Sequence, residues 1–205
     1  MTDFFIADTH FFHDAIAANR GFQTVEQHNR TIIDNIMHDT RPGDTIFFVG
    51  DVIGRTDDAD AALDLIAHNI PNRTLRLIAG NHDPVHPMSS KAHKHTPDWL
   101  KVFDSIQSHT FIKVMGQKIP VSHFPYTGES ASRHLEDRHV QWRMRDLGTP
   151  IIHGHTHATD PVSTSDNGTI QICVSADAWN MKPVSKETLT ATISKHVTTP
   201  IKGQG

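Results

Sequence analysis

The chain has 205 residues, a formal net charge of −4 with histidine counted as neutral, and one cysteine, Cys173. That length is enough for a substantial buried core, and we predict a single domain over residues 1–205. The acidic balance argues against extended nucleic acid as a partner, because binding to its backbone needs clustered lysine and arginine. One cysteine rules out an intramolecular disulfide, which fits a reducing compartment.

The hydropathy pattern argues against a membrane partner. Residues 1–7 lack the basic leader of a signal peptide. Apolar stretches fall well short of the roughly 20 residues that a transmembrane helix needs. We therefore expect a soluble cytoplasmic protein, and we leave open whether it forms a homodimer.

Short apolar runs alternate with helical patterns in the first half of the chain. The expected elements, in order, are a strand at 4–7, a helix at 24–37, a strand at 45–49, a helix at 57–68 and a strand at 75–79. Because this alternation is typical of parallel βαβ units, we predict an α/β fold whose first half forms a parallel sheet.

The second half has a different pattern. Two apolar runs flank Met115-Gly116-Gln117, which predicts a β-hairpin. The further expected elements are an arginine-rich helix at 132–147 and strands at 150–152, 169–174 and 188–193. The sheets are therefore predicted to become mixed toward the end of the chain.

Residues with metal-binding side chains follow the predicted strands. Asp8, Asp51, Asn81, His123 and His155 each come just after an apolar run. Because ligand sites in open α/β sheets lie beyond the carboxyl ends of the strands, we expect these side chains to converge. Taken singly, each short motif also fits a polar loop or turn. The complete set in this order favours a metal centre.

The donor set is large enough for two ions. One ion needs three or four protein ligands, and the candidate ligands are Asp8, His10, Asp51, Asn81, His123, His155 and His157. Asp51 is the expected bridge, because one carboxylate can give an oxygen to each ion. This mixture of donors suits Mn²⁺ best, with Fe, Ni²⁺, Co²⁺ and Zn²⁺ as alternatives. Paired ions suit phosphoryl chemistry, and we expect the neighbouring His153 to be packed or to support the ligands.

The order Asp-x-His, Gly-Asp, Gly-Asn-His-Asp, His, Gly-His-x-His resembles the calcineurin-like metallophosphoesterase superfamily. The resemblance implies a four-layer α/β/β/α sandwich of two mixed sheets, with a dinuclear metal site at the strand carboxyl ends. It also divides the ligands into two overlapping sets. One ion would be held by Asp8, His10, Asp51 and His157, and the other by Asp51, Asn81, His123 and His155.

The same resemblance implies roles beside the metal ligands. His82 corresponds to the catalytic histidine that binds phosphate and protonates the leaving oxygen, and Asp83 would orient it through a hydrogen bond. Arg55 occupies the position of the arginine in Gly-Asp-x-x-x-Arg, where it could contact phosphate, pair with Asp83 or remain solvated. His13 could cap a helix near the phosphate or could equally be a surface histidine. The expected substrate-binding residues are Asn81, His82 and His13.

Departures from the phosphoprotein phosphatases favour the small bacterial and phage-type phosphodiesterase branch. Thr56 follows Arg55, Asp83 replaces a glutamate, and residues 174–184 resemble a C-terminal signature of that branch. To this last segment we assign no chemical role, and we expect Trp179 to pack in the core or to form a pocket wall. The expected activity is hydrolysis of small nucleotide-like or cyclic nucleotide phosphodiesters by a metal-bridged hydroxide. The alternatives are a phosphomonoesterase or nuclease of the same superfamily, and a non-catalytic metal-binding scaffold.

Overall fold

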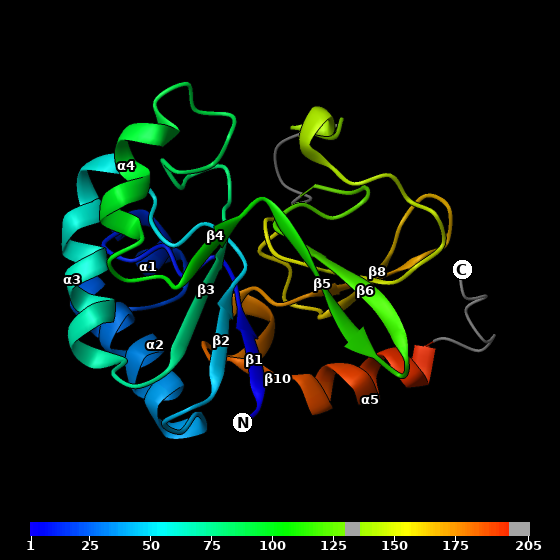
Figure 1. Ribbon diagram of the computed structural model, residues 1–205, viewed down its shortest axis with the longest axis horizontal. Coiled ribbons are helices and arrows are strands. Elements are labelled where there is room, and N and C mark those ends of the chain that lie inside the picture. Colours follow the sequence, from blue (N-terminus) through cyan, green and yellow to red (C-terminus); the bar gives the residue numbers. More distant parts are fainter. Residues whose placement is uncertain (130–135, 197–205) are drawn as a thin grey trace.

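A computed structural model describes residues 1–129 and 136–196 and shows two five-stranded sheets packed face to face (Figure 1). The first sheet has the order β10-β1-β2-β3-β4. Four of its strands are parallel, and β10 pairs with β1 antiparallel. The strands are β1 (Asp3–Ile6), β2 (Thr45–Phe48), β3 (Thr74–Ile78), β4 (Ser105–Gln107) and β10 (Val184–Ser185). The parallel sheet predicted for the first half is confirmed.

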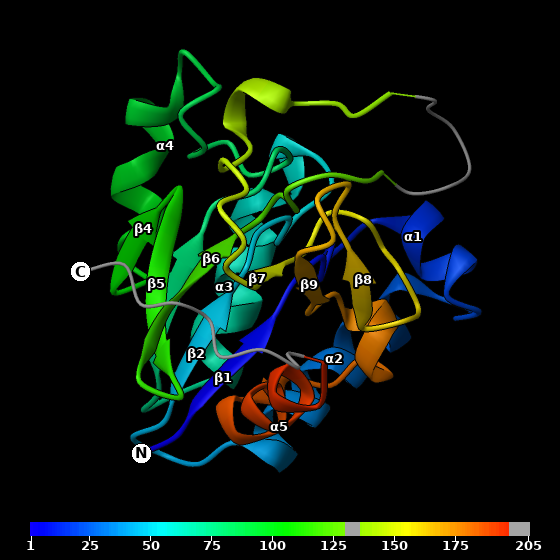
Figure 2. The ribbon, with the colours of Figure 1, turned by 90° about the vertical axis from the view of Figure 1, so that its right-hand side faces the viewer.

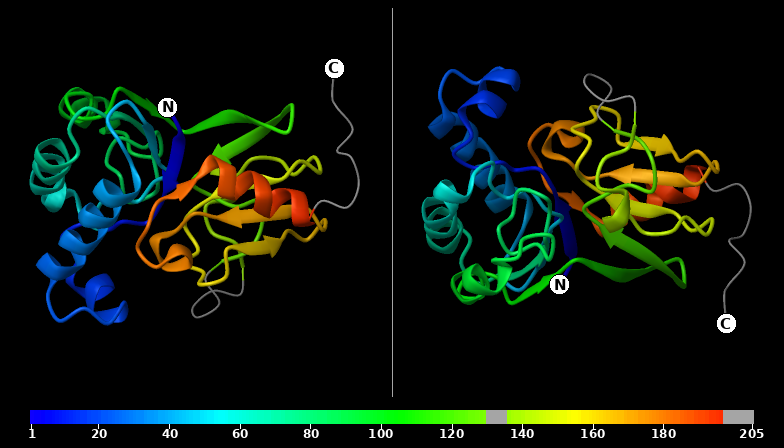
Figure 3. Two further views of the ribbon diagram at one scale, coloured as in Figure 1. Left: turned by 90° about the horizontal axis from the view of Figure 1, so that it is seen from below. Right: turned by 90° about the horizontal axis from the view of Figure 1, so that it is seen from above.

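Helices cover the outer face of this first sheet (Figures 1 and 3). They are α1 (Asp14–Asn19), α2 (Val25–Asp39), α3 (Ala59–Asn69) and α4 (Ala92–Trp99), with the short turn η1 (Thr56–Asp58) before α3. Helix α2 begins where the Thr24 side chain accepts a hydrogen bond from the Gln27 amide. Its buried isoleucines pack with Ile46 and Phe48 of β2 in one core cluster.

The second sheet has the order β5-β6-β7-β9-β8 (Figure 2). Its three inner strands are parallel and its two edge strands are antiparallel. The strands are β5 (His109–Val114), β6 (Gln117–Ser122), β7 (Ile151–His153), β8 (Val162–Thr164) and β9 (Ile170–Cys173). The predicted hairpin is confirmed. Val114 pairs with Gln117, so its turn contains only Met115 and Gly116, and both have positive φ, as a type I′ turn requires.

A second core cluster lies between the two sheets. Phe5 and Phe47 of the first sheet stack with ring centroids 4.8 Å apart and face Val121 and Ile172 of the second. Helix α5 (Lys186–His196) contacts β1, β9 and β10, and its buried Leu189 and Ile193 join this cluster. It lies at the end of the sandwich away from the carboxyl ends of β1, β2 and β3 (Figure 1). The two-sheet sandwich expected from the resemblance is therefore confirmed.

Two predicted elements are wrong. Residues 188–193 belong to helix α5 and not to a strand, because the Ser185 hydroxyl accepts from the Thr188 amide at 3.2 Å and starts a helix. The predicted helix at 132–147 begins outside the described residues, and residues 136–147 contain only the turn η2 (Val140–Trp142). There the Arg143 side chain bonds to the carbonyls of Pro125 and Gly128, so tertiary contacts hold this segment.

The strands β4, β8 and β10 and the helices α1 and α4 were not predicted. Each is short, and α4 contains Pro97, which is unfavourable inside a helix. Across the described parts of the chain, none of the helices is long and apolar enough to cross a membrane.

Candidate metal centre

The loops that follow β1 and β2 run side by side and place the first candidate ligands. The amide of Asp8 donates to the carbonyl of Gly50 at 2.9 Å, and the amide of His10 donates to the carbonyl of Asp51 at 3.0 Å. Phe11 continues this pairing to Val52 at 2.8 Å. The parallel sheet thus extends past its strands as a pair of loops, which brings two sequence motifs about 40 residues apart into contact.

The glycines of two motifs allow these loops to approach closely. Gly50 has φ +88°, a backbone conformation that other residues rarely adopt, and a Cβ there would overlap the ring of His123. A Cβ at Gly80 would overlap Asp51 and the same ring. The three loops after β2, β3 and β6 are therefore in backbone-to-side-chain contact at this point.

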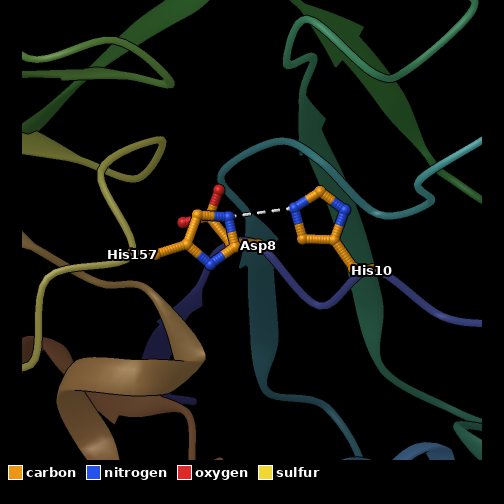
Figure 4. A group of neighbouring side chains, drawn as sticks. All are labelled: Asp8, His10 and His157. Carbon is orange, nitrogen blue, oxygen red and sulfur yellow. Dashed lines mark hydrogen bonds between the residues drawn. The ribbon is translucent and has the colours of Figure 1, made fainter. Parts of the chain in front are cut away.

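The first cluster contains Asp8, His10 and His157 (Figure 4). The ring of His10 donates from Nδ1 to the Ile53 carbonyl at 3.2 Å, and the ring of His157 donates from Nδ1 to the Asp177 carboxylate at 3.0 Å. In a neutral ring this leaves Nε2 with a free lone pair. The two Nε2 atoms face each other at 3.1 Å, an arrangement that suits a cation between them.

The second cluster contains Asp51, His123 and His155, with Asn81 beside it. The ring of His123 donates from Nδ1 to the Val49 carbonyl at 2.8 Å, and its Nε2 lies 3.2 Å from the amide oxygen of Asn81. Burial would lower the pKa of His123, but the Asp51 carboxylate outweighs it and raises this pKa to about 9. The site therefore attracts positive charge, which a bound cation would supply.

Asp51 lies between the two clusters. Its Oδ2 atom is 3.8 Å from Nε2 of His10 and 3.4 Å from Nε2 of His123. Burial alone would raise the pKa of the Asp51 carboxyl, but His123 and His10 outweigh it and hold the pKa well below its usual range. The residue expected to bridge two ions is thus charged, and its Oδ2 atom lies near both histidines. The residues present fit a pair of divalent ions.

Comparison with known proteins agrees with this arrangement. Residues 1–175 match the calcineurin-like phosphoesterase superfamily domain. The chain belongs to this superfamily. Its members typically bind two divalent metal ions, and the two clusters of this chain are the residues that could hold them.

Relatives of the chain come from phages and archaea. It is similar to the Gene 66 protein of Mycobacterium phage L5, with 36% identity over 85% of this chain and 86% of the phage protein. The Uncharacterized protein MJ1445 of Methanocaldococcus jannaschii is 29% identical, over 94% of this chain and 91% of the archaeal protein. A crystal structure of AQ665, a protein of unknown function from Aquifex aeolicus, has a TM-score of 0.66, 22% identity, and coverage of 93% and 98% of the two chains. This last likeness shows the fold alone.

Within the superfamily fold, His82 lies beside the first cluster. Its ring centroid is 5.3 Å from that of His10, its side chain is exposed, and its amide donates to Oδ1 of Asp51 at 2.9 Å. The ring donates from Nδ1 to the Gly54 carbonyl at 2.9 Å. Nε2 is therefore the nitrogen left to meet a substrate.

Asp83 differs from its expected contact, whereas Arg55 lies in one of its expected positions. Asp83 is buried and accepts backbone amides instead of orienting His82: Oδ2 accepts from Gly80 at 2.7 Å and Asp51 at 3.0 Å, and Oδ1 accepts from Val52 at 2.9 Å. Arg55 is exposed and pairs with Asp58 at 3.1 Å and not with Asp83. Asp83 thus fixes the ligand loops, and Arg55 takes the solvated alternative.

His13 and His153 have structural contacts. His13 caps α1 by accepting from the Ile16 amide at 3.4 Å, so its expected capping role is confirmed. His153 is buried in β7, where its Nδ1 lies 2.7 Å from the Gly154 carbonyl oxygen. Trp179 packs against the cluster between the sheets, as predicted, and its indole donates to the Cys173 carbonyl at 2.8 Å.

Two carboxylates beside the ligand histidines were not predicted. Asp177 accepts from His157, and Glu129 lies 3.2 Å from Nε2 of His155. If the His155 ring donates Nε2–H to Glu129, its Nδ1 is left for an ion. Arg143, itself buried, pairs with Glu129 at 2.6 Å. Asp177 lies in segment 174–184, whose resemblance to a C-terminal signature was the one sequence signal that could have pointed to it. No sequence signal pointed to Glu129.

Five of the seven candidate ligands also share an unusual backbone conformation. Positive φ occurs at Asp8 (55°), His10 (44°), Asp51 (52°), His155 (70°) and His157 (50°). Each such residue costs on the order of 1 kcal/mol or more unless surrounding contacts offset it. Strained backbone is therefore concentrated where the two clusters meet.

Proposed function

We propose that this protein is a dinuclear metal-dependent phosphodiesterase that hydrolyses small nucleotide-like or cyclic nucleotide diesters, with Mn²⁺ as its preferred ion. The observation that carries the proposal is the position of Asp51 between two donor clusters, with His82 beside them. Bound ions would supply a water of lowered pKa and would neutralise charge on the phosphate.

The protein's own groups provide the remaining chemistry. Asp8, His10 and His157 would hold one ion, while Asn81, His123 and His155 would hold the other, and Asp51 would contact both. His82 would bind a phosphate oxygen and, in the form that carries a proton on both ring nitrogens, would give the Nε2 proton to the leaving alkoxide while Nδ1 stays bonded to Gly54. The backbone amide of His82 donates to the Asp51 carboxylate, which fixes the position of His82 relative to the bridging residue.

The pairing of nearby arginines supports a diester over a monoester. Arg20 pairs with Asp177, Arg55 with Asp58, and Arg143 with Glu129. A terminal phosphate carries more charge than a diester and benefits more from uncommitted guanidinium groups. With these three arginines already bound to carboxylates, the singly charged diester is the better match.

The test compares two esters on the same protein. The full chain is stripped with a chelator, Mn²⁺ is added back, and hydrolysis of bis(p-nitrophenyl) phosphate is measured against p-nitrophenyl phosphate. We expect metal-restored cleavage that prefers the diester and that Asp51→Asn abolishes. A preference for the monoester would contradict the proposal and indicate a phosphatase. Binding of two ions without cleavage of either ester would instead support the scaffold alternative.

A further inference from the structure

The segment after β9 has a contact that its predicted packing role leaves unexplained. Asp177 lies in the turn η3 (Ala176–Trp179), and its carboxylate accepts from Nδ1 of His157 at 3.0 Å. The hydroxyl of Ser175 donates to the same oxygen at 2.8 Å. Asp177 therefore touches a candidate metal ligand on the side of the ring away from the cluster.

Arg20 fixes this carboxylate. It follows helix α1, and its side chain is only 4% exposed. Nε donates to Oδ1 of Asp177 at 2.9 Å, and Nη2 donates to Oδ2 at 2.6 Å, so the pair is bidentate. Such a planar, two-bond pair orients a carboxylate more firmly than a single contact does.

The same guanidinium also holds the loop of the other ligands. Nη2 of Arg20 donates to the carbonyl of Asp8 at 2.7 Å, and Nη1 lies 3.5 Å from the carbonyl of Thr9. Nη1 is also 2.9 Å from Nε2 of His28, which must accept as a neutral ring. One side chain thus joins the loop of Asp8 and His10 to the carboxylate behind His157.

We propose that Asp177 and Arg20 are positioning residues that set the ring of His157 and the Asp8 loop for binding of one ion. Asp177 holds His157 with the hydrogen on Nδ1 and the lone pair on Nε2, and it increases the basicity of the ring toward the metal. Arg20 holds both the carboxylate and the backbone of the facing loop. The inference rests on the metal centre proposed above and not on the choice of a diester.

The first experiment measures ion binding without substrate. Mn²⁺ is titrated calorimetrically into the chelator-stripped full chain and its Asp177→Asn variant. We expect the variant to bind one of two ions about 10- to 100-fold more weakly and the other as the parent does. Asp146→Asn is the matched control. Asp146 is also a half-buried carboxylate that accepts from two hydroxyls, those of Ser165 and Thr169, yet it lies outside both clusters.

A second readout follows the ring itself. Nitrogen-detected NMR of the histidine rings, with Zn²⁺ as a diamagnetic probe, should show His157 protonated at Nδ1 and metal-bound at Nε2 in the parent. In Asp177→Asn this signature should change, while that of His123, which donates to the Val49 carbonyl, stays the same. A purely structural role for Asp177 would leave the tautomer of His157 unaltered.

The outcomes separate this inference from the proposed function. Unchanged affinities and an unchanged His157 signature in Asp177→Asn overturn the positioning role. If Asp177→Asn does not fold, Arg20→Lys keeps the charge but loses the bidentate pair, and it must weaken the same ion or the inference fails. A parent that binds no ion overturns the metal centre itself, whereas a parent that binds two ions but cleaves neither ester overturns only the activity.

Discussion

The Nε2 atoms of His10 and His157 lie 3.1 Å apart, although each ring already donates from Nδ1 to another acceptor. In neutral rings both lone pairs then point at the same place, which a cation or a proton must occupy. Without an ion, one of the two rings must carry a second proton, and a bound ion would take the place of that proton.

Removing one of these rings should remove one ion. We expect His10→Ala to reduce the metal bound at equilibrium from two ions per chain to one, because one cluster loses a ligand and the other keeps all of its own. Equilibrium dialysis followed by elemental analysis measures this. His93→Ala removes an exposed histidine of α4 and should leave two ions bound. Equal losses in both variants would mean that ions bind to the histidine-rich surface.

His82 should matter for the leaving group and not for the ions. We expect His82→Asn to lower kcat by about 10²- to 10⁴-fold on a diester with an alkoxide leaving group, because that oxygen needs a proton. On bis(p-nitrophenyl) phosphate the loss should be smaller, since its leaving group is weakly basic. Kinetics on both esters, with metal content determined in parallel, test this. A fall in bound metal would identify His82 as a ligand.

The strand ends and the candidate ligands were predictable because short, local stretches of sequence specify both. An apolar run such as Ile46-Phe47-Phe48-Val49 followed by Gly50-Asp51 needs no knowledge of the rest of the chain. By contrast, Thr188 to Ile193 alternates polar and apolar residues as a strand would, whereas Ser185 caps a helix that buries Leu189 and Ile193, four residues apart.

The positioning contacts were not predictable, because they depend on tertiary structure. Arg20 and Asp177 are 157 residues apart, and neither lies in a ligand motif. The role of Asp83 was mistaken for a related reason. The resemblance implied a hydrogen bond from Asp83 to His82, whereas the fold places three backbone amides around the carboxylate.

Asp83 should accordingly contribute to stability. Asp83→Ala leaves the amides of Gly80, Asp51 and Val52 without this acceptor, and each buried unpaired donor costs about 1–3 kcal/mol. We expect a clear decrease in the urea midpoint of the metal-free protein, and a smaller decrease for Asp83→Asn, which keeps one oxygen. Asp57→Ala, at an exposed carboxylate, serves as the control. A midpoint equal to that of the parent would return Asp83 to a purely catalytic role.

Acid should destabilise the fold partly through His28. Burial and the charge of Arg20 lower the pKa of His28 to about 4, while an unfolded histidine has a pKa of about 6.5. Between these values the unfolded chain binds more protons, so the free energy of unfolding should fall as pH decreases from about 6.5 to 4.

His28→Gln tests this contribution, because glutamine can accept from Arg20 but does not titrate. Urea unfolding of chelator-stripped protein at several pH values should show a shallower acid slope in the variant than in the parent. The other histidines titrate equally in both proteins, so their effects cancel in the comparison. Parallel slopes would show that His28 does not contribute.

The close approach of the glycine-containing loops limits how this protein can change. Gly80 has no room for a methyl group beside Asp51 and His123, and Gly50 has none beside His123 and Gly80. A larger residue at either glycine therefore demands compensating mutations in a neighbouring loop, which seldom arise together. Evolutionary divergence should accordingly leave this part nearly constant and alter substrate preference through the segments around it. Libraries for redirecting specificity would best be restricted to those outer segments.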